Sequence, residues 1–214
     1  MRTLPIGPFR AAGAALSLAA LVLLGALAGC GDDPSGPRVK TDADLNVVEQ
    51  APTAPALTVT TRTLLVTRGE DAELRLYYRG RLGTADSTEF LRLRFDDETL
   101  LARPDGTPIL VGQSVLVTVT VPDPTKFLVN LEPTGLRFNP NRPAELKWKL
   151  NEREHDLDDD GDIDATDASL FTTLAVWRQE TAGQPWSRLA SKIEVELDEI
   201  DVDLVGFSNY IVAY

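Results

Sequence analysis

Cysteine and histidine are nearly absent from this chain of 214 residues, which contains one of each. A disulfide framework needs pairs of cysteines, and a zinc site of thiolate or imidazole ligands needs several such side chains, so both are excluded. Basic residues are also scarce, because 21 Lys and Arg stand against 33 Asp and Glu, for a net charge of −12. Nucleic-acid binding requires a basic face, which argues against a nucleic-acid partner.

Charged side chains are missing from residues 11–28, an apolar run preceded by two arginines and followed by small residues. This order is typical of a secretory signal peptide. The sequence Leu27-Ala28-Gly29-Cys30 resembles the lipobox of bacterial lipoproteins, in which the chain is cut before a cysteine that then receives acyl chains. We therefore expect a signal peptide over residues 1–29 and lipidation of Cys30. The alternative is an uncleaved anchor with an incidental cysteine, because about 18 apolar residues approach the length of a membrane span.

The lipoprotein resemblance also implies a location in the cell envelope. Gly31, rather than Asp, follows the cysteine, and by the same resemblance this favours the outer membrane, with the lipid as the contact to the bilayer. Cleavage would remove two arginines and no acid, which changes the net charge from −12 to −14. Residues 30–56 are rich in Pro, Gly and Asp and show no apolar period, which predicts a flexible tether before a domain over residues 57–214. A disordered start with no spacing role has the same composition.

Apolar and polar residues alternate along much of the remaining chain. A period of two is typical of strands with one buried face in an antiparallel sheet. About ten short strands separated by Pro, Gly and Asp turns predict an all-β fold, an antiparallel β-sandwich of the immunoglobulin-like kind. The clearest alternating segments are 72–78, 91–95, 117–121 and 144–150.

The last predicted hairpin joins residues 193–197 to residues 200–204 through a two-residue turn, Asp198-Glu199. Its outward face would set Glu196 opposite Asp201, and like charges across a ladder are unfavourable. Either an exposed edge kept soluble by charge or a contact surface that needs cations would account for this face. The apolar residues of both segments would face inward: Ile193, Val195, Leu197, Ile200, Val202 and Leu204.

Three segments within residues 127–214 carry a family resemblance: LEPTGLRFNPNRPAELKWKL, LAVWRQETAGQPWSRL and VDLVGFSNYIVAY. They resemble bacterial envelope proteins related to the ZU-five domain of netrin receptors and ankyrins. The resemblance implies a β-sandwich that serves as a structural or interaction module, with its motif residues at core and turn positions and none of them catalytic. The matching positions are Pro133, Gly135, Phe138, Pro140, Trp177, Gly183, Trp186, Phe207, Ser208, Tyr210 and Val212.

Seven aspartates crowd the segment from residue 156 to residue 167. Counted from Asp156, oxygen ligands fall at positions 1, 3, 5, 7, 9 and 12 and Gly161 falls at position 6, which is the spacing of an EF-hand calcium loop. A hard cation takes six to eight oxygens, and the glycine permits a sharp reversal. The predicted Ca²⁺ ligands are Asp156, Asp158, Asp160, Asp162, Asp164 and Asp167, with Asp162 acting through its backbone carbonyl.

Position 12 of this loop is Asp167 instead of the usual Glu. In this respect the loop resembles those of dockerin modules, although dockerins carry two loops and this chain has one, so no cohesin partner is inferred. We expect Ile163 to be buried under the loop and a short helical turn to follow Ala165, with Leu170 and Phe171 packing inward. An acidic loop that stays solvated without a metal is the alternative.

Catalysis has little support in the sequence. His155 is the one possible imidazole base and borders the acidic loop, and no G-x-S-x-G nucleophile turn occurs. We therefore expect a non-enzymatic, lipid-anchored, extracytoplasmic β-sandwich, stabilised by calcium, that acts as a structural or binding module for an envelope protein or polysaccharide. A carbohydrate-binding or adhesion module is the first alternative and requires Tyr77, Phe90 and Trp186 together on one exposed face. A carboxylate-based hydrolase is the second and requires a cleft that joins two carboxylates.

Overall fold

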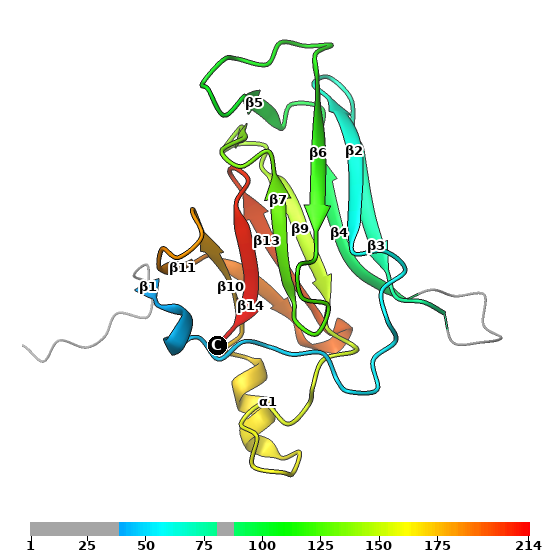
Figure 1. Ribbon diagram of the computed structural model, residues 1–214, viewed down its shortest axis with the longest axis vertical. Coiled ribbons are helices and arrows are strands. Elements are labelled where there is room, and N and C mark those ends of the chain that lie inside the picture. Colours follow the sequence, from blue (N-terminus) through cyan, green and yellow to red (C-terminus); the bar gives the residue numbers. More distant parts are fainter. Residues whose placement is uncertain (1–38, 81–87) are drawn as a thin grey trace, which may run out of the picture. The chain divides into compact units, whose positions relative to one another are not determined.

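The structure, a computed structural model, describes residues 39–80 and 88–214 (Figure 1). The predicted signal peptide and Cys30 lie outside the described residues. Within the described part, none of the helices has the length and apolar character needed to cross a membrane.

Antiparallel strands are the main regular structure of the described chain, and they form two large sheets and one small one. The seven-stranded sheet has the order β1-β11-β10-β14-β7-β6-β2, the five-stranded sheet has the order β12-β13-β9-β4-β3, and β5 pairs with β8. The strands are β1 (Val39–Lys40), β2 (Thr61–Thr67), β3 (Ala72–Tyr77), β4 (Glu89–Phe95), β5 (Leu100–Ala102), β6 (Ser114–Thr120), β7 (Leu128–Glu132), β8 (Arg137–Phe138), β9 (Ala144–Lys149), β10 (Ala175–Gln179), β11 (Trp186–Arg188), β12 (Ser191–Glu194), β13 (Glu199–Leu204) and β14 (Asn209–Ala213). The helices are η1 (Asp42–Asp44), α1 (Ala165–Phe171) and η2 (Val195–Leu197).

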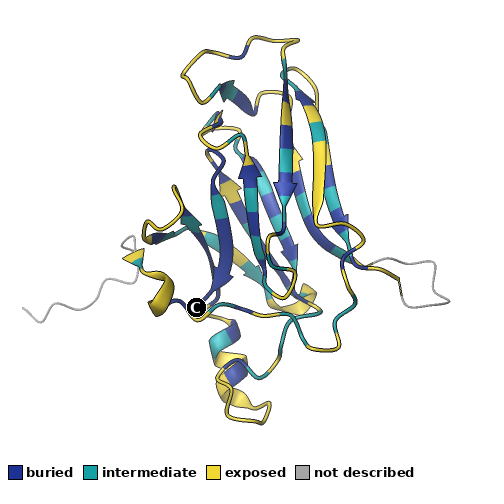
Figure 2. Cartoon of the chain, in the orientation of Figure 1, coloured by how far each residue is buried: buried dark blue, intermediate teal, exposed yellow. Residues whose placement is uncertain are grey.

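The core lies between the inward faces of the two large sheets, as the alternation predicts. In β9, Leu146 and Trp148 are fully buried, whereas Lys147 and Lys149 on the other face are partly exposed. Figure 2 shows the same alternation of buried and more exposed residues along other strands. The all-β, antiparallel sandwich expected from the sequence is therefore confirmed.

The residues that carry the ZU-five resemblance lie mainly in this core and at its turns. Phe138 and Phe207 pack edge to face, with ring centroids 5.0 Å apart. Gly135 and Gly183 adopt positive φ angles of 83° and 81°, which glycine alone adopts without strain. Many β-sandwiches need such core and turn residues, so their placement does not test the resemblance.

The segment before the first long strand is folded, not flexible. The backbone N–H of Val48 donates to the carbonyl of Val212 (3.0 Å), and that of Tyr214 donates to the carbonyl of Asn46 (3.1 Å). Trp186 Nε1 donates to a carboxylate oxygen of Asp42 at 2.5 Å. The tether predicted over residues 30–56 is therefore wrong for residues 39–56, which belong to the sandwich predicted to begin at residue 57.

A second, smaller core explains why these N-terminal residues are ordered. It lies on the outward face of the seven-stranded sheet, where side chains of β10, β11 and β14 would otherwise meet water. The N-terminal segment covers this face with Leu45 and, at its margin, Val47. The buried members of this cluster are Leu45, Ala175, Trp177, Trp186, Ile211 and Ala213.

The C-terminal hairpin exists, but its turn is longer than predicted. Ile193 pairs with Ile200, and the chain between β12 and β13 forms η2 and then Asp198, which has a left-handed φ of 48°. The two-residue turn at 198–199 is therefore wrong, and the register differs from the prediction by four residues. Because four is an even number, Val202 still faces inward. The side chains of Val195 and Leu197, which were expected to face inward, are exposed.

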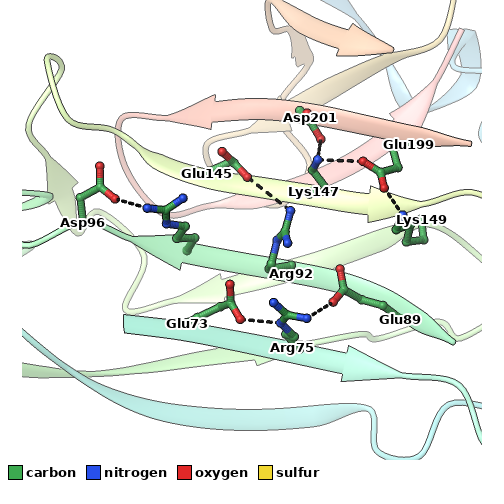
Figure 3. A network of polar contacts seen from close by, with 11 residues as sticks. Glu73, Arg75, Glu89, Arg92, Asp96, Glu145, Lys147, Lys149, Glu199 and Asp201 are labelled. Atoms are coloured by element: carbon green, nitrogen blue, oxygen red, sulfur yellow. Dashed lines mark hydrogen bonds and ion pairs between the residues drawn. The ribbon is translucent and has the colours of Figure 1, made fainter. Parts of the chain in front are cut away.

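Two outward acids of β13, Glu199 and Asp201, are compensated by lysines of β9 (Figure 3). Asp201 stands opposite Lys192 in β12 instead of Glu196, and Lys147 Nζ lies 3.2 Å from its carboxylate. Glu199, whose side chain is 7% exposed, receives Lys147 Nζ at 2.7 Å and also contacts Lys149. At Asp201 the repulsion expected from the sequence is thus replaced by an ion pair, whereas Asp203 stands opposite Glu145 in β9.

The register of β13 can be tested with two valines. Val202 is 3% exposed and Val205, just beyond the strand, is 53% exposed. We expect Val202→Asp to lower the free energy of unfolding by roughly 3 kcal/mol or more, because it buries an unpaired charge. Val205→Asp should change it by about 0.5 kcal/mol at most. Chemical denaturation measures both values, and equal losses would contradict the register.

Candidate metal centre in the acidic loop

The acidic loop connects β9 to β10 and ends in α1, a helix of seven residues. Asp164 is the N-cap, and its side chain accepts the N–H of Thr166 at 2.6 Å. Asp167 completes a capping box by accepting the N–H of Asp164 at 2.8 Å. Leu170 packs against the core and Phe171 is buried. The short helix and its inward anchors were both predicted, and both are confirmed.

Asp167 ties the start of the loop to its end. One of its carboxylate oxygens accepts the N–H of Leu157 at 2.6 Å, and the other accepts the N–H of Asp164. The Asp167 side chain is buried. These backbone hydrogen bonds, that from Asp164 first, hold the pKa of Asp167 below its ordinary value. The carboxylate therefore stays charged inside the loop.

Asp156 shapes the reversal in the middle of the loop. Its two carboxylate oxygens accept the N–H groups of Asp160 at 3.2 Å and of Gly161 at 2.9 Å. Gly161 has a φ of 97°, so the glycine at position 6 permits the reversal that the calcium-loop spacing requires.

Three of the six predicted ligands converge. One carboxylate oxygen from each of Asp156, Asp158 and Asp167 lies within 4.8 Å of the other two. The pKa of Asp158 is raised, first by desolvation and then by the negative charges of Asp160 and Asp167. In the absence of a cation, the structure therefore disfavours the charge of Asp158.

The other three predicted ligands, Asp160, Asp162 and Asp164, lie outside this group of three. Asp160 instead accepts the N–H of Asp162 at 3.1 Å, and Asp164 serves as the helix cap. The carboxylates of Asp160 and Asp164 thus organise the backbone around the convergent group.

The expectation that Ile163 is buried is wrong, since it is 70% exposed. The loop is anchored on the domain by Leu157, at its second position, and by Phe171 of α1, and not by the residue at position 8. Tyr214 adds a further link, because its hydroxyl donates to the carbonyl of Leu157. His155 is exposed, as expected for a loop residue.

The structure also bears on the two alternatives to a structural module, an aromatic binding face and a cleft with two carboxylates. Phe90 and Trp186 are buried and Tyr77 is half-buried, so these three do not form an exposed aromatic face. Glu145 and Asp203 are cross-strand partners that line two surface hollows of about 220 and 350 Å³. Arg94 and Arg142 line the first hollow, and Lys192 lines the second. A carboxylate-based hydrolase needs one carboxylic acid that apolar surroundings keep protonated. The basic side chains in both hollows favour the charged carboxylate instead, which does not support this alternative.

Comparisons of the chain with protein-family models, with curated proteins and with solved structures found no match. The resemblances to lipoproteins, to the ZU-five domain and to dockerin loops therefore stay predictions from the sequence.

The opposite environments of Asp158 and Asp167 predict opposite effects of one substitution. In metal-free solution at pH 7, we expect Asp158→Asn to raise the free energy of unfolding, because it removes a disfavoured charge. Asp167→Asn should lower it, because an amide nitrogen cannot accept the second backbone N–H. Urea denaturation in the presence of a chelator measures both.

The dependence on pH follows from the two pKa shifts. Because the pKa of Asp158 is raised in the folded protein, its charge destabilises the fold fully at pH values above that pKa. This destabilisation has disappeared once the pH lies below the ordinary carboxyl pKa. The lowered pKa of Asp167 makes its contribution complete above the ordinary value, and it is lost as the pH falls through the lowered one. Each variant's difference from wild type in the free energy of unfolding should therefore shrink as the pH falls. The difference for Asp158→Asn should shrink first. Effects of the same sign at pH 7 would refute this account of the loop.

Proposed function

We propose that this protein is a lipid-anchored module of a bacterial cell envelope whose β-sandwich is stabilised by one calcium ion in the loop 156–167. The module serves a structural or binding role rather than a catalytic one. The observation that carries the calcium part is the convergence of Asp156, Asp158 and Asp167 in a loop with the EF-hand spacing.

The donor set fits a hard cation. Calcium takes six to eight oxygen ligands, among them carboxylates that bind with one or both oxygens. Asp156 and Asp167 each accept backbone N–H groups, but every carboxylate oxygen has two lone pairs, so these hydrogen bonds leave acceptor capacity for an ion. Asp158 adds a third carboxylate to the convergent group. Asp160, Asp164 and the carbonyl of Asp162 complete the proposed set.

Calcium at this site would act on more of the domain than its own loop. The loop is linked to the C-terminus through Tyr214 and Leu157. It is linked to the N-terminal segment because the N–H of Glu154 donates to the carbonyl of Glu49 at 2.9 Å. A cation that holds the loop therefore also holds both ends of the sandwich, which favours a stabilising role.

The anchor part of the proposal rests on the sequence Leu27-Ala28-Gly29-Cys30. Val39 already lies in strand β1 of the domain, which limits how far a lipid on Cys30 could hold the domain from the bilayer. Eight intervening residues reach at most roughly 30 Å when fully extended. The proposed module therefore works close to the membrane surface, where it meets envelope components near the bilayer.

Calcium should raise the free energy of unfolding, because it binds the folded loop and not the unfolded chain. At about a hundredfold excess over Kd the increment is roughly 2.7 kcal/mol, with a matching rise in Tm. Magnesium should do less, since its small octahedral shell retains water. Thermal unfolding in a calcium titration measures the effect.

A neighbouring pair of aspartates gives the matched control. Asp158→Asn should remove most of the calcium increment, because Asp158 belongs to the convergent group. Asp159→Asn should keep it, because this residue lies outside the group and its φ of 57° is tolerated by Asn. Equal calcium responses from the two variants would reduce the loop to a diffuse acidic patch.

Cys30→Ser tests the anchor independently of calcium. The thiol is the proposed acyl acceptor, so the variant should stay uncleaved and unlabelled by a radioactive fatty acid in bacterial cells, whereas the wild-type chain is shortened and labelled. Normal processing and labelling of the variant would remove the lipid from the proposal.

A further inference from the structure

The edge of the seven-stranded sheet at β2 lacks the features that keep other edges from pairing. Exposed edges are commonly blocked by lysine, proline, inward charges, bulges or short length. β2 runs for seven residues, TRTLLVT, with no lysine, proline or acid, and its register with β6 is regular. Its one charged residue is Arg62.

The other described edges of the two large sheets are short, charged or covered. β1 has two residues, and β12 has four, including Lys192 and Glu194. β3 carries Glu73 and Arg75, and Arg62 of β2 reaches its edge by donating to the carbonyl of Arg75 at 2.8 Å, so β2 and β3 are neighbours at this end.

The hydrogen-bonding groups on the open side of β2 can be identified from its ends. The N–H of Val121 donates to the carbonyl of Thr60 (2.7 Å), and the N–H of Arg68 donates to that of Gln113 (3.0 Å). Residues with even numbers therefore bond to β6, because hydrogen-bonded pairs recur every second residue in an antiparallel ladder. Thr61, Thr63 and Leu65 direct their N–H and C=O groups toward the open edge.

An exposed apolar pair lies beside this edge. Leu65 is 61% exposed, and its cross-strand partner Leu116 in β6 is 59% exposed, both on the outward face of the sheet. The next pairs along the ladder are Thr63 with Thr118 and Thr61 with Thr120. The surface next to the edge is thus flat and uncharged, and a second strand laid against β2 would cover part of Leu65.

We propose that β2 pairs antiparallel with β2 of a second copy of this chain, which joins the two seven-stranded sheets across a two-fold axis. Two copies of a chain with net charge −12 repel each other wherever their acidic residues meet. Among the described edge strands, β2 is the longest that carries no acid, so it is the edge at which a second copy can pair. An antiparallel pair of identical strands also uses the same open N–H and C=O groups on both sides and closes as a dimer.

Analytical ultracentrifugation over a range of concentrations tests this pairing. The chain is purified from residue 30 onward with Cys30→Ser, so that neither acyl chain nor thiol links two copies; residues 37–214 form one compact unit that this removal leaves whole. We expect a monomer–dimer equilibrium whose dimer fraction rises with concentration. A wild-type monomer at all concentrations would overturn the proposal.

Three variants locate the contact. Thr63→Pro removes an N–H on the open edge and none of the bonds to β6, and Leu65→Lys places a charge on that edge. Both should give monomers. Leu116→Lys is the control, because it adds the same charge to the same face, at similar exposure, one strand away from the edge, and it should keep most of the dimer.

The melting temperature of each variant shows whether it folds, and Leu65→Lys decides the outcome if Thr63→Pro unfolds. Dimer loss with Leu116→Lys equal to that with Leu65→Lys would mean that the copies meet face to face, and the edge pairing would be withdrawn. The same holds if the dimer survives Leu65→Lys. None of these results bears on the calcium loop or the lipid, so the failure of one proposal leaves the others standing.

Discussion

The contact of Glu199 with Lys147 and Lys149 shows the constraint under which this fold is built: negative charge has to be compensated wherever it is buried. β13 carries an acid at each outward position, namely Glu199, Asp201 and Asp203. It lies between β9 and β12, two strands that contain lysines. Without those lysines, burial of Glu199 would leave an unpaired charge in the sheet. The compensation is local to Glu199 and Asp201, because Asp203, the third outward acid of β13, stands opposite Glu145 in β9.

The acidic loop obeys the same constraint by other means, since basic side chains are not what holds it. Backbone N–H groups compensate Asp167 and Asp156, which is why the pKa of Asp167 is lowered although other aspartates surround it. Asp158 has the opposite shift, and its raised pKa marks the place where protein groups fall short. The convergence of its carboxylate with those of Asp156 and Asp167, in a loop with the EF-hand spacing, is the basis for proposing calcium rather than a solvated loop.

The strands and the loop could be predicted because their signals are local. Alternation identified β9 despite its lysines, and Gly161 at position 6 of the loop anticipated the reversal. The folded state of residues 39–56 could not be predicted from the sequence. Isolated apolar residues such as Leu45 and Val48 form no periodic pattern, and their role follows only from their packing against β14 and its neighbours. The turn of the C-terminal hairpin was predicted wrongly for a related reason. Asp198 in a left-handed conformation allows a longer turn, and apolar periodicity does not distinguish this turn from a two-residue one.

The proposals on the anchor, the metal and the β2 edge also have one electrostatic argument in common. Copies of an acidic protein held within roughly 30 Å of a bilayer are concentrated there, and their mutual repulsion is screened beyond about 8 Å at physiological salt. What then decides whether two copies associate is the character of the surfaces that touch. Calcium in the loop would lower the net negative charge without altering β2, and this edge, which has no acid, would supply the backbone groups and Leu65. Lipid attachment would thus favour a contact that is weak in free solution, by raising the effective concentration and not by adding a bond.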